Sequence, residues 1–550
     1  MKIHKYFKYF LSLMLLLLFS GFFPGKGDLY FEISKNIDLF GAVYKEISLN
    51  YVDDVDPEKF MREGIKGMLN SLDPYTIFID ENKKEDIDLI TNGKYGGVGI
   101  SIGIRGDNVT VVEVLDGYSA QRQGIRIGDI LIEAAGIPIT PENMEDISSL
   151  VKGKPGTEVE LKVLRNSDKD TLRFNLIREE VIVKNLTYYG FYPKNSNNVY
   201  MKLTSFSRSA GNEVKKALRE LKEEKEIKSV IFDLRGNPGG LLDVAVDISD
   251  KFLKKDQLIV TTMGREEVSK KDYFAVQEPM IGNAKLVILI NGGSASASEI
   301  VAGAMQDHDR GVILGTKSYG KGLVQTITPM SYNTSIKITT AKYYTPSGRC
   351  IQKIDYSKGS DVIVNVDTLI ASPFSTDNKR VVYGAGGISP DTTVEFKTEG
   401  DLTAELLAKG LFFKFADYYY YLNPHEDFSS INDDKLINEF TKYLREHDFV
   451  YKSESEKQLN RLVADAKKKE LNESVVADLE DAKKYFQEID SGELVVYRDE
   501  ILMEIKGELA SRYYGSEGKI EELLKHDKQF QVAYDVVRDQ TVYNGLLSNK

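Results

Sequence analysis

The segment from Asn291 to Gln325 reads NGGSASASEIVAGAMQDHDRGVILGTKSYGKGLVQ, and the rest of the chain is organised around it. The apolar residues 287–290 precede it as the end of a buried strand, and the glycines then form a turn. Ser296 enters a run rich in Ala, Ile, Val and Met, and the small residues beside it leave its hydroxyl open to a substrate. Lys321 follows 25 residues later between two glycines. An amine in such a tight loop can return to the serine as its general base.

The start of the expected helix favours one further role. If Ser296 opens the helix, the amide of Ala297 points out of the helix start, where developing negative charge is stabilised. Such an amide is half of an oxyanion hole. Two plainer interpretations remain. Ser296 to Glu299 also fits a capping box, S-x-x-E before an apolar run. Residues 315–322, GTKSYGKG, are close to a phosphate-binding loop, but Gly322 stands where the magnesium-binding hydroxyl should be.

The string SASASEI, the GKG loop and the trailing VQ resemble the carboxy-terminal processing peptidases, serine proteases of the tail-specific type. The resemblance covers residues 35–395. It implies that Ser296, the middle serine, is the nucleophile, that Lys321 is its base and that Gln325 supports the lysine. It further implies an α/β multidomain protein, in which a crotonase/Clp-protease-like Ser-Lys protease core carries an inserted PDZ domain and a helical C-terminal region.

Composition limits the function classes. The length of 550 residues suggests several domains. The net charge of −12 argues against nucleic acid as a partner and favours solubility. The single cysteine, Cys350, excludes an internal disulfide framework and a multi-cysteine zinc site, and the five histidines form no HExxH motif. We therefore expect no metal and no cofactor. The family resemblance implies a protein or peptide as the substrate.

Residues 1–26 read as an export signal. Three lysines come first, and an apolar run over 9–23 follows with LMLLLLF at its centre. This run is shorter than the about 20 residues of a membrane span, and no A-x-A cleavage site is evident, so a signal peptide and an uncleaved anchor both stay open. In either case the bulk of the chain should lie in the periplasm or cell envelope. Inner-membrane association and homo-oligomer formation also stay open.

Residues 27–94 read as a helical N-terminal region. Apolar residues recur at helical spacing over 37–47, and Pro57 opens a second such run. The string LDPYT, 72–76, resembles the segment that precedes the binding domain in the processing peptidases. The plainer alternative is an ordinary Asp-Pro turn.

Residues 95–180 read as a PDZ domain. A glycine-rich loop leads into two strands at 100–104 and 109–114, GIRIGDILI follows, and a helix is expected over 143–151. A PDZ domain adds a peptide to its sheet edge and holds the terminal carboxylate with backbone amides. Those amides are expected after Gly97, at Val98, Gly99 and Ile100. The alternative is a small β-rich domain without a ligand.

Residues 181–395 alternate strand and helix patterns, which predicts an α/β core. Strands are expected at 199–203 and 229–234, and helices at 212–222 and 241–253. The string DLRGNPGG after the second strand resembles the processing peptidases, and the resemblance implies that Gly239 or Gly240 supplies the second oxyanion donor. A glycine turn that starts the helix is the plainer interpretation. KYYTPSGRCIQ, 342–352, and GGISPD, 386–391, also match the family.

Residues 396–550 are rich in Lys, Glu, Asp, Leu and Tyr, with few glycines. They read as a helical C-terminal domain without a catalytic constellation. A solvated structural bundle is the default interpretation of this region.

The general base decides the mechanism. His308 is the histidine nearest to Ser296, and on one helix the two would lie about 18 Å apart, which excludes a histidine triad through it. Lysine acts as a base only when neutral, so its pKa must fall by roughly 3 units from about 10.4, and burial can supply that shift. Whether 321–325 is helix or strand stays open.

The sequence therefore predicts an exported serine endopeptidase with a Ser-Lys dyad. The PDZ domain would bind C-terminal or unstructured protein segments. A silent PDZ scaffold should have lost the serine or the lysine, and both are present. A nucleotide-binding protein should carry a hydroxyl residue after Lys321 and no export signal, and neither condition holds.

Overall fold

The structure is a computed structural model that describes residues 26–80, 93–165, 170–356, 364–365, 372–395, 400–469 and 472–548. The chain divides into two compact units, one of residues 1–78 and 357–361, the other of residues 79–356 and 362–550. The export signal predicted for 1–26 lies, apart from its last residue, outside the described residues and stays a prediction. Within the described part of the chain, no helix combines the length and the apolar character of a membrane span.

The first unit contains two helices, α2 (Lys26–Asn50) and α3 (Pro57–Asn70). The proline begins α3 as predicted, because a first-turn position needs no amide donor. The Asp56 carboxylate caps this helix by accepting hydrogen bonds from the amides of Glu58 and Lys59. The short strand β1 (Ile77–Ile79) follows.

The PDZ region is built on an antiparallel sheet of order β3-β4-β5-β7-β8, with β6 paired to β5. Strands β2 and β9 form a separate two-stranded ribbon where the chain enters and leaves this region. Its core contains buried Val, Ile and Leu from alternate strand positions and from α6, together with Ala120 of α5. The elements are β2 (Lys94–Gly97), β3 (Ile100–Arg105), β4 (Asn108–Val114), α5 (Ser119–Gln123), β5 (Ile130–Ala134), β6 (Ile137–Pro138), η2 (Pro141–Asn143), α6 (Met144–Val151), β7 (Glu158–Arg165), β8 (Asp170–Ile177) and β9 (Glu179–Ile182).

The central domain contains a six-stranded sheet of order β10-β11-β12-β15-β16-β23, in which β11 to β23 run parallel and β10 runs antiparallel. A second, antiparallel arrangement joins β14, β13, β18 and β17. The elements of the large sheet and its helices are β10 (Leu186–Phe191), β11 (Asn198–Leu203), α7 (Ala210–Glu224), β12 (Ser229–Asp233), α8 (Leu242–Asp250), β15 (Lys285–Ile290), α9 (Ala297–Asp307), β16 (Val312–Gly315) and β23 (Thr392–Thr393). The remaining elements are β13 (Leu258–Met263), η3 (Glu267–Ser269), β14 (Lys271–Phe274), β17 (Leu323–Pro329), β18 (Ser335–Tyr344), β19 (Ile354–Asp355), β20 (Val364–Asn365), β21 (Pro373–Ser375) and β22 (Val381–Tyr383).

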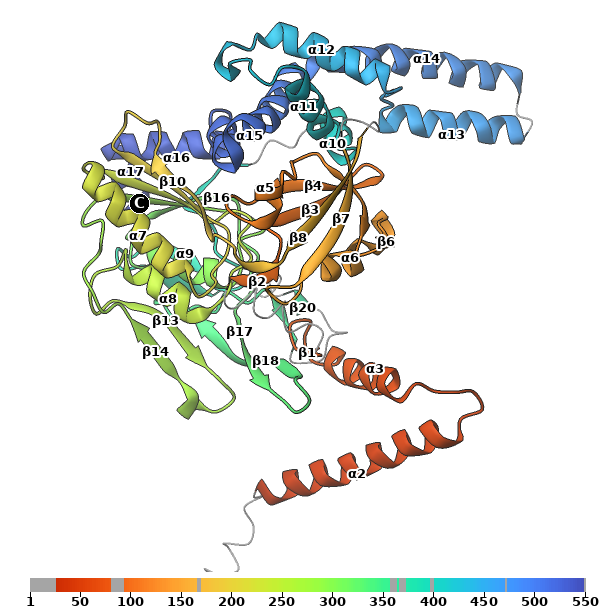
Figure 1. Cartoon of the computed structure of the whole chain (residues 1–550). Coiled ribbons are helices and arrows are strands. Elements are labelled where there is room, and N and C mark those ends of the chain that lie inside the picture. Colours follow the sequence, from red (N-terminus) through yellow and green to blue (C-terminus); the bar gives the residue numbers. More distant parts are fainter. Residues whose placement is uncertain are drawn as a thin grey trace, which may run out of the picture. The chain divides into compact units, whose positions relative to one another are not determined.

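Helices cover both faces of the six-stranded sheet, as the ribbon of Figure 1 shows. Strand β15 illustrates why: Leu286 and Ile288 pack in the core that contains residues of α7, α8 and α9, whereas Val287 and Leu289 pack against α16 and α17. Side chains alternate between the faces of a strand, so a strand that is apolar at every position must be covered on both sides.

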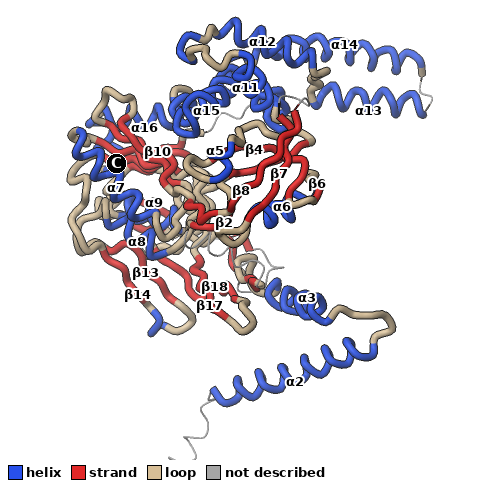
Figure 2. Tube along the Cα trace, in the orientation of Figure 1, coloured by secondary structure: helices blue, strands red, loops and turns tan. Residues whose placement is uncertain are grey.

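The C-terminal region is helical throughout its described residues, which Figure 2 shows in blue. It forms a core of its own from α10, α11, α12 and α15, but α16 and α17 pack in the core of the central domain. The prediction of a helical region over 396–550 thus missed that its last part covers the sheet. The helices are α10 (Asp401–Ala408), α11 (Leu411–Leu422), η5 (Phe428–Ser430), α12 (Asp433–Glu446), α13 (Glu454–Lys468), α14 (Glu473–Val496), α15 (Arg498–Leu524), α16 (Lys528–Arg538) and α17 (Gln540–Leu547).

Candidate active site

The turn between β15 and α9 carries the predicted nucleophile in an unusual backbone conformation. Ser296 has φ 54° and ψ −111°, a positive φ that costs energy for any residue with a side chain. Its amide donates to the Glu299 carboxylate at 2.8 Å, and its carbonyl accepts from the Tyr343 hydroxyl at 3.2 Å. These bonds hold the strained residue in place at the first turn of the helix.

The three serines of SASAS have different surroundings. The Ser294 hydroxyl donates to the Leu234 carbonyl at 2.8 Å, and the Ser298 hydroxyl donates to the Asn237 carbonyl at 2.9 Å. Both serines are fully buried, whereas Ser296 is half-buried. The outer two hydroxyls therefore stabilise the turn, and Ser296 is the serine that a substrate can reach.

A buried carboxylate joins the serine turn to the lysine loop. Oε2 of Glu299 accepts hydrogen bonds from the Ser296 amide at 2.8 Å and from the Lys321 amide at 2.9 Å. Oε1 accepts from the Ser318 hydroxyl at 2.5 Å and from the Gly320 amide at 2.7 Å. One oxygen atom accepts from both amides. The separation of the amide nitrogens of Ser296 and Lys321 therefore cannot exceed the sum of these two hydrogen-bond lengths.

Sequence reasoning assigned Glu299 to a capping box and missed this connection. The carboxylate does accept the N-cap amide, as the motif predicts, but the same group also reaches the loop 22 residues further on. Burial raises the pKa of Glu299 to about 7, against the four hydrogen bonds, which act in the opposite direction. The local motif indicates the carboxylate but not its second set of partners.

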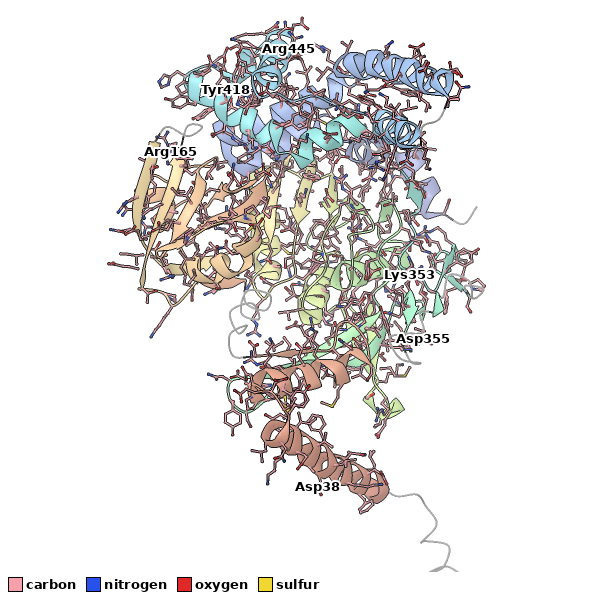
Figure 3. The ribbon with its side chains drawn as sticks, turned by 90° about the vertical axis from the view of Figure 1, so that its right-hand side faces the viewer. Asp38, Arg165, Lys353, Asp355, Tyr418 and Arg445 are labelled. Carbon is pink, nitrogen blue, oxygen red and sulfur yellow. The ribbon has the colours of Figure 1, made fainter. Side chains whose placement is uncertain are left out.

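The lysine loop is held by close backbone contacts. Gly320 has φ +90°, and a Cβ there would lie 3.0 Å from the Gly387 amide nitrogen and 2.8 Å from Cβ of Lys353. The amide of Gly322 donates to the side chain of Gln352 at 2.6 Å. Lys353, labelled in Figure 3, donates its amide to the Gly320 carbonyl at 2.9 Å. The glycines that flank the lysine are therefore required by space, and the GGI and CIQ motifs supply the neighbouring walls.

The third predicted residue, Gln325, lies on strand β17, which begins at Leu323, after the lysine. This answers the open question of helix or strand. A bulge between Val324 and Gln325 alters the alternation of side chains along the strand. Nε2 of the Gln325 side chain donates to the Thr339 hydroxyl at 3.2 Å. Its predicted support of Lys321 stays a prediction.

The oxyanion donors can be compared by their hydrogen bonds. Ala297 begins α9 and is fully buried, and no acceptor among the described residues binds its amide. A Cβ on Gly239 would lie 2.9 Å from this amide nitrogen, so the DLRGNPGG loop packs directly on the helix start. The Gly239 amide donates to the Asn237 side chain at 2.9 Å, while in the described chain nothing accepts from the Gly240 amide. In this conformation Ala297 and Gly240 are the two predicted oxyanion donors whose amides are available to bind an oxyanion.

His308 does not take part in this site. It follows the last residue of α9, at the opposite end from Ser296. One ring nitrogen lies 2.8 Å from the Asp377 carboxylate and the other 2.7 Å from the Leu258 carbonyl. Both nitrogens thus bind structural partners, as expected for a histidine that is not the base.

The predicted peptide-binding residues lie at an edge of the PDZ sheet. Gly97 ends β2, and the following residues lead into β3, whose partner within this sheet is β4. The carbonyls of Val98 and Gly99 accept from the amides of Ala120 and Leu115, which fixes the loop before the edge strand. An edge strand behind such a loop is the arrangement to which peptides add as a further strand.

A parallel α/β core, a serine at a strained strand-to-helix turn and a lysine loop bonded to the same carboxylate define a serine-type peptidase. Four family models match: "Peptidase family S41" at residues 197–359, "PDZ domain" at 110–165, "Probable PDZ-protease, C-terminal helical domain" at 402–537 and "Activating protease CtpB N-terminal domain" at 27–83. The chain belongs to the carboxy-terminal processing proteases of peptidase family S41, and the family resemblance is confirmed.

Two curated relatives support this assignment. The carboxy-terminal-processing protease of Bartonella bacilliformis is 35% identical over 333 residues, which cover 60% of this chain and 75% of the relative. The carboxy-terminal processing protease CtpB of Bacillus subtilis is 30% identical over 386 residues, 70% of this chain and 76% of the relative. Among solved structures, the photosystem II D1 C-terminal processing protease is 23% identical and covers 66% of this chain and 89% of its own, with a TM-score of 0.35.

Proposed function

We propose that this protein is an exported endopeptidase that cleaves protein segments with a dyad of Ser296 and Lys321. The observation that carries the proposal is the shared carboxylate oxygen of Glu299, which binds the amides of both residues. The serine is half-buried between two serines whose hydroxyls are already bonded. A nucleophile and its base must be held within reach of each other before a substrate arrives.

The reaction then follows from the positions of these groups. The neutral amine of Lys321 takes the proton of the Ser296 hydroxyl as Oγ attacks the peptide carbonyl carbon. The carbonyl oxygen becomes an oxyanion, which accepts hydrogen bonds from the Ala297 amide and from an amide of the 239–240 loop. The lysine returns the proton to the departing amine as the C–N bond breaks. Water, deprotonated by the same lysine, hydrolyses the acyl-enzyme.

The PDZ domain supplies the substrate in this proposal. An extended protein tail pairs with the edge strand β3, and backbone amides near residues 97–100 bind its terminal carboxylate. The export signal expected at 1–26 places the enzyme in the periplasm or cell envelope, where it meets exported protein tails. Recognition of a free terminus and cleavage at Ser296 are thus assigned to separate domains.

The dyad is tested with single serine variants and an unstructured protein substrate. Ser296→Ala should abolish cleavage and keep the fold, because alanine fits the same small site. Ser294→Ala and Ser298→Ala are the matched controls and should retain cleavage, with some loss of thermal stability because each removes one buried hydrogen bond to a backbone carbonyl. Activity in Ser296→Ala, measured by initial rates, would exclude this serine as the nucleophile.

The PDZ assignment is tested by deleting residues 95–180 and joining residue 94 directly to residue 181. Two substrates are compared that differ only in their terminus, one a free carboxylate and the other an amide. The full chain should have a lower KM for the free acid, and the deletion variant should lose this difference. A deletion variant that still prefers the free acid would contradict the role of the PDZ domain.

A further inference from the structure

The side chain of Arg235, in the DLRGNPGG loop, joins the loop to the C-terminal helices. Its guanidinium binds Asp233, the last residue of β12, at 2.6 Å and Asp527 at 2.6 Å, and it donates to Gln529 at 2.9 Å. The pair with Asp527 is bidentate, because a second nitrogen donates to the other carboxylate oxygen at 3.1 Å. Arg235 is 11% exposed and Asp233 is fully buried, so these charges depend on each other for compensation.

Asp527 and Gln529 are themselves fixed by the first turn of α16. Asp527 is the N-cap residue of this helix, and its carboxylate also accepts from the Phe530 amide at 3.0 Å. Gln529 is 1% exposed and donates to the Val394 carbonyl at 2.7 Å. The helix is anchored in turn by Phe530, which packs in the core on the sheet face opposite α9.

The loop and the first turn of α16 border a common pocket. This pocket has a volume of about 520 Å³, and its lining includes Arg235, Gly236, Asn291, Asp527 and Gln529. Beside the pocket, the hydrogen bonds of the Arg235 guanidinium join the loop to Asp527 and Gln529.

The loop leads directly to the nucleophile. The Gly236 amide donates to the Asn291 side chain at 2.9 Å. The carbonyl of Asn237 accepts from the Ala295 amide at 3.0 Å and from the Ser298 hydroxyl at 2.9 Å. A displacement of the loop by a fraction of an ångström would therefore move the serine turn and the 239–240 amides together.

We propose that Asp527 and Gln529 are positioning residues of the peptidase reaction. By holding Arg235, the first turn of α16 fixes the loop that presents the second oxyanion donor next to Ser296. The first turn of α16 then acts on the active site through Arg235. The inference rests on the proposed roles of Ser296 and of the 239–240 loop.

The test replaces Asp527 by serine, which still caps a helix but is too short for the guanidinium. The matched control is Asp539→Ser, because Asp539 caps α17 through the amides of Thr541 and Val542 and contacts no residue of the loop. Asp527→Ser should lower kcat by about 10- to 100-fold with KM changed less than about 2-fold, since interactions confined to the transition state act on kcat. The control should keep kcat at a similar melting temperature.

Two further measurements separate positioning from a loss of folding. A peptide aldehyde forms a hemiacetal whose oxygen occupies the oxyanion hole, so its inhibition constant should rise in Asp527→Ser by about the factor lost in kcat. Asp527→Asn, which keeps the cap and one acceptor, should recover part of kcat. Equal kcat in Asp527→Ser and Asp539→Ser, in an enzyme that Ser296→Ala inactivates, would overturn the inference. Activity that survives Ser296→Ala would instead contradict the proposed function.

Discussion

Glu299 receives four hydrogen bonds while fully buried, which makes its charge state matter to the whole site. Glu299→Gln places an amide NH₂ against backbone N–H groups, so at least one buried donor loses its acceptor. We expect a fall in kcat on the order of 10-fold or more. Initial rates are compared with those of Glu213→Gln, which removes a carboxylate that also accepts several bonds but none from the dyad. Equal rates in the two variants would contradict the role given to Glu299.

The raised pKa of Glu299 also predicts a dependence of stability on pH. Its carboxyl binds protons more tightly in the folded chain, with a pKa of about 7 against an ordinary value of 4.5. The free energy of unfolding should therefore fall as pH rises between these two values and level off above about 7. The neutral side chain of Glu299→Gln lacks this term. Its melting temperature relative to wild type should thus increase from pH 5 to pH 8, and a constant difference would contradict the assignment.

Lys321 is predicted to act by losing its proton. Lys321→Arg keeps the charge and much of the length, but arginine does not deprotonate in proteins. It should thus be as inactive as Lys321→Ala. The measurement is the initial rate of cleavage of an unstructured protein across pH 5 to 10, in which wild-type activity should rise with pH and stay high. Substantial activity in the arginine variant would exclude the lysine as base.

At the scale of elements, the GKG loop depends on a close approach of two backbones. Gly320→Ala adds a Cβ against Gly387 and Lys353 and must displace the loop that carries Lys321. Gly348→Ala is the matched control, because its φ of +87° is equally unfavourable but nothing lies within 4 Å of the new atom. Both variants should lose a similar amount of stability to backbone strain. Only Gly320→Ala should lose activity, by roughly 10-fold or more, and full activity in it would show that the loop tolerates displacement.

Much of the fold follows from local patterns, and the rest depends on partners that are distant in sequence. The helix expected at 212–222 and the strand at 229–234 appear as α7 and β12, with ends that differ by at most two residues. The dyad candidates came from motifs, but Glu299 bonds to 318–321 and Arg235 bonds to a residue 292 positions away. Periodicity reports which face of an element is buried and does not report which polar groups meet there.

The sequence does indicate that one distant packing partner must exist, the layer of helices on the second face of the sheet. The strand KLVILI is apolar on both faces, which requires a layer of helices on each side of the sheet. The helices between the strands, α7 to α9, supply one layer, and the second had to come from elsewhere in the chain. The different composition of residues 396–550 favours a separate domain, but composition does not indicate where a helix packs.

For the whole molecule, this arrangement predicts that the C-terminal helices are not dispensable. Truncation after His526 removes α16 and α17 and exposes the sheet face formed by Tyr200, Ile231, Val287 and Leu289. We expect the melting temperature of the protease core to fall by roughly 10 °C or more. The hairpin of α13 and α14 in Figure 1 contributes no residue to that face. Deletion of 455–488, within this hairpin, should therefore leave the melting temperature of the protease core nearly unchanged. Similar transitions in both deletions would contradict the packing described.

The ion pair between Arg235 and Asp527 also implies that the active site is completed late in synthesis of the chain. The ribosome makes Arg235 292 residues before its partner, a delay of about 15 to 60 s at ordinary rates of synthesis. During that interval the newborn protease is itself an unfolded chain with susceptible segments. We expect the chain to lack full proteolytic activity until the segment that contains Asp527 has been synthesised. This delay protects each copy from self-digestion while it folds.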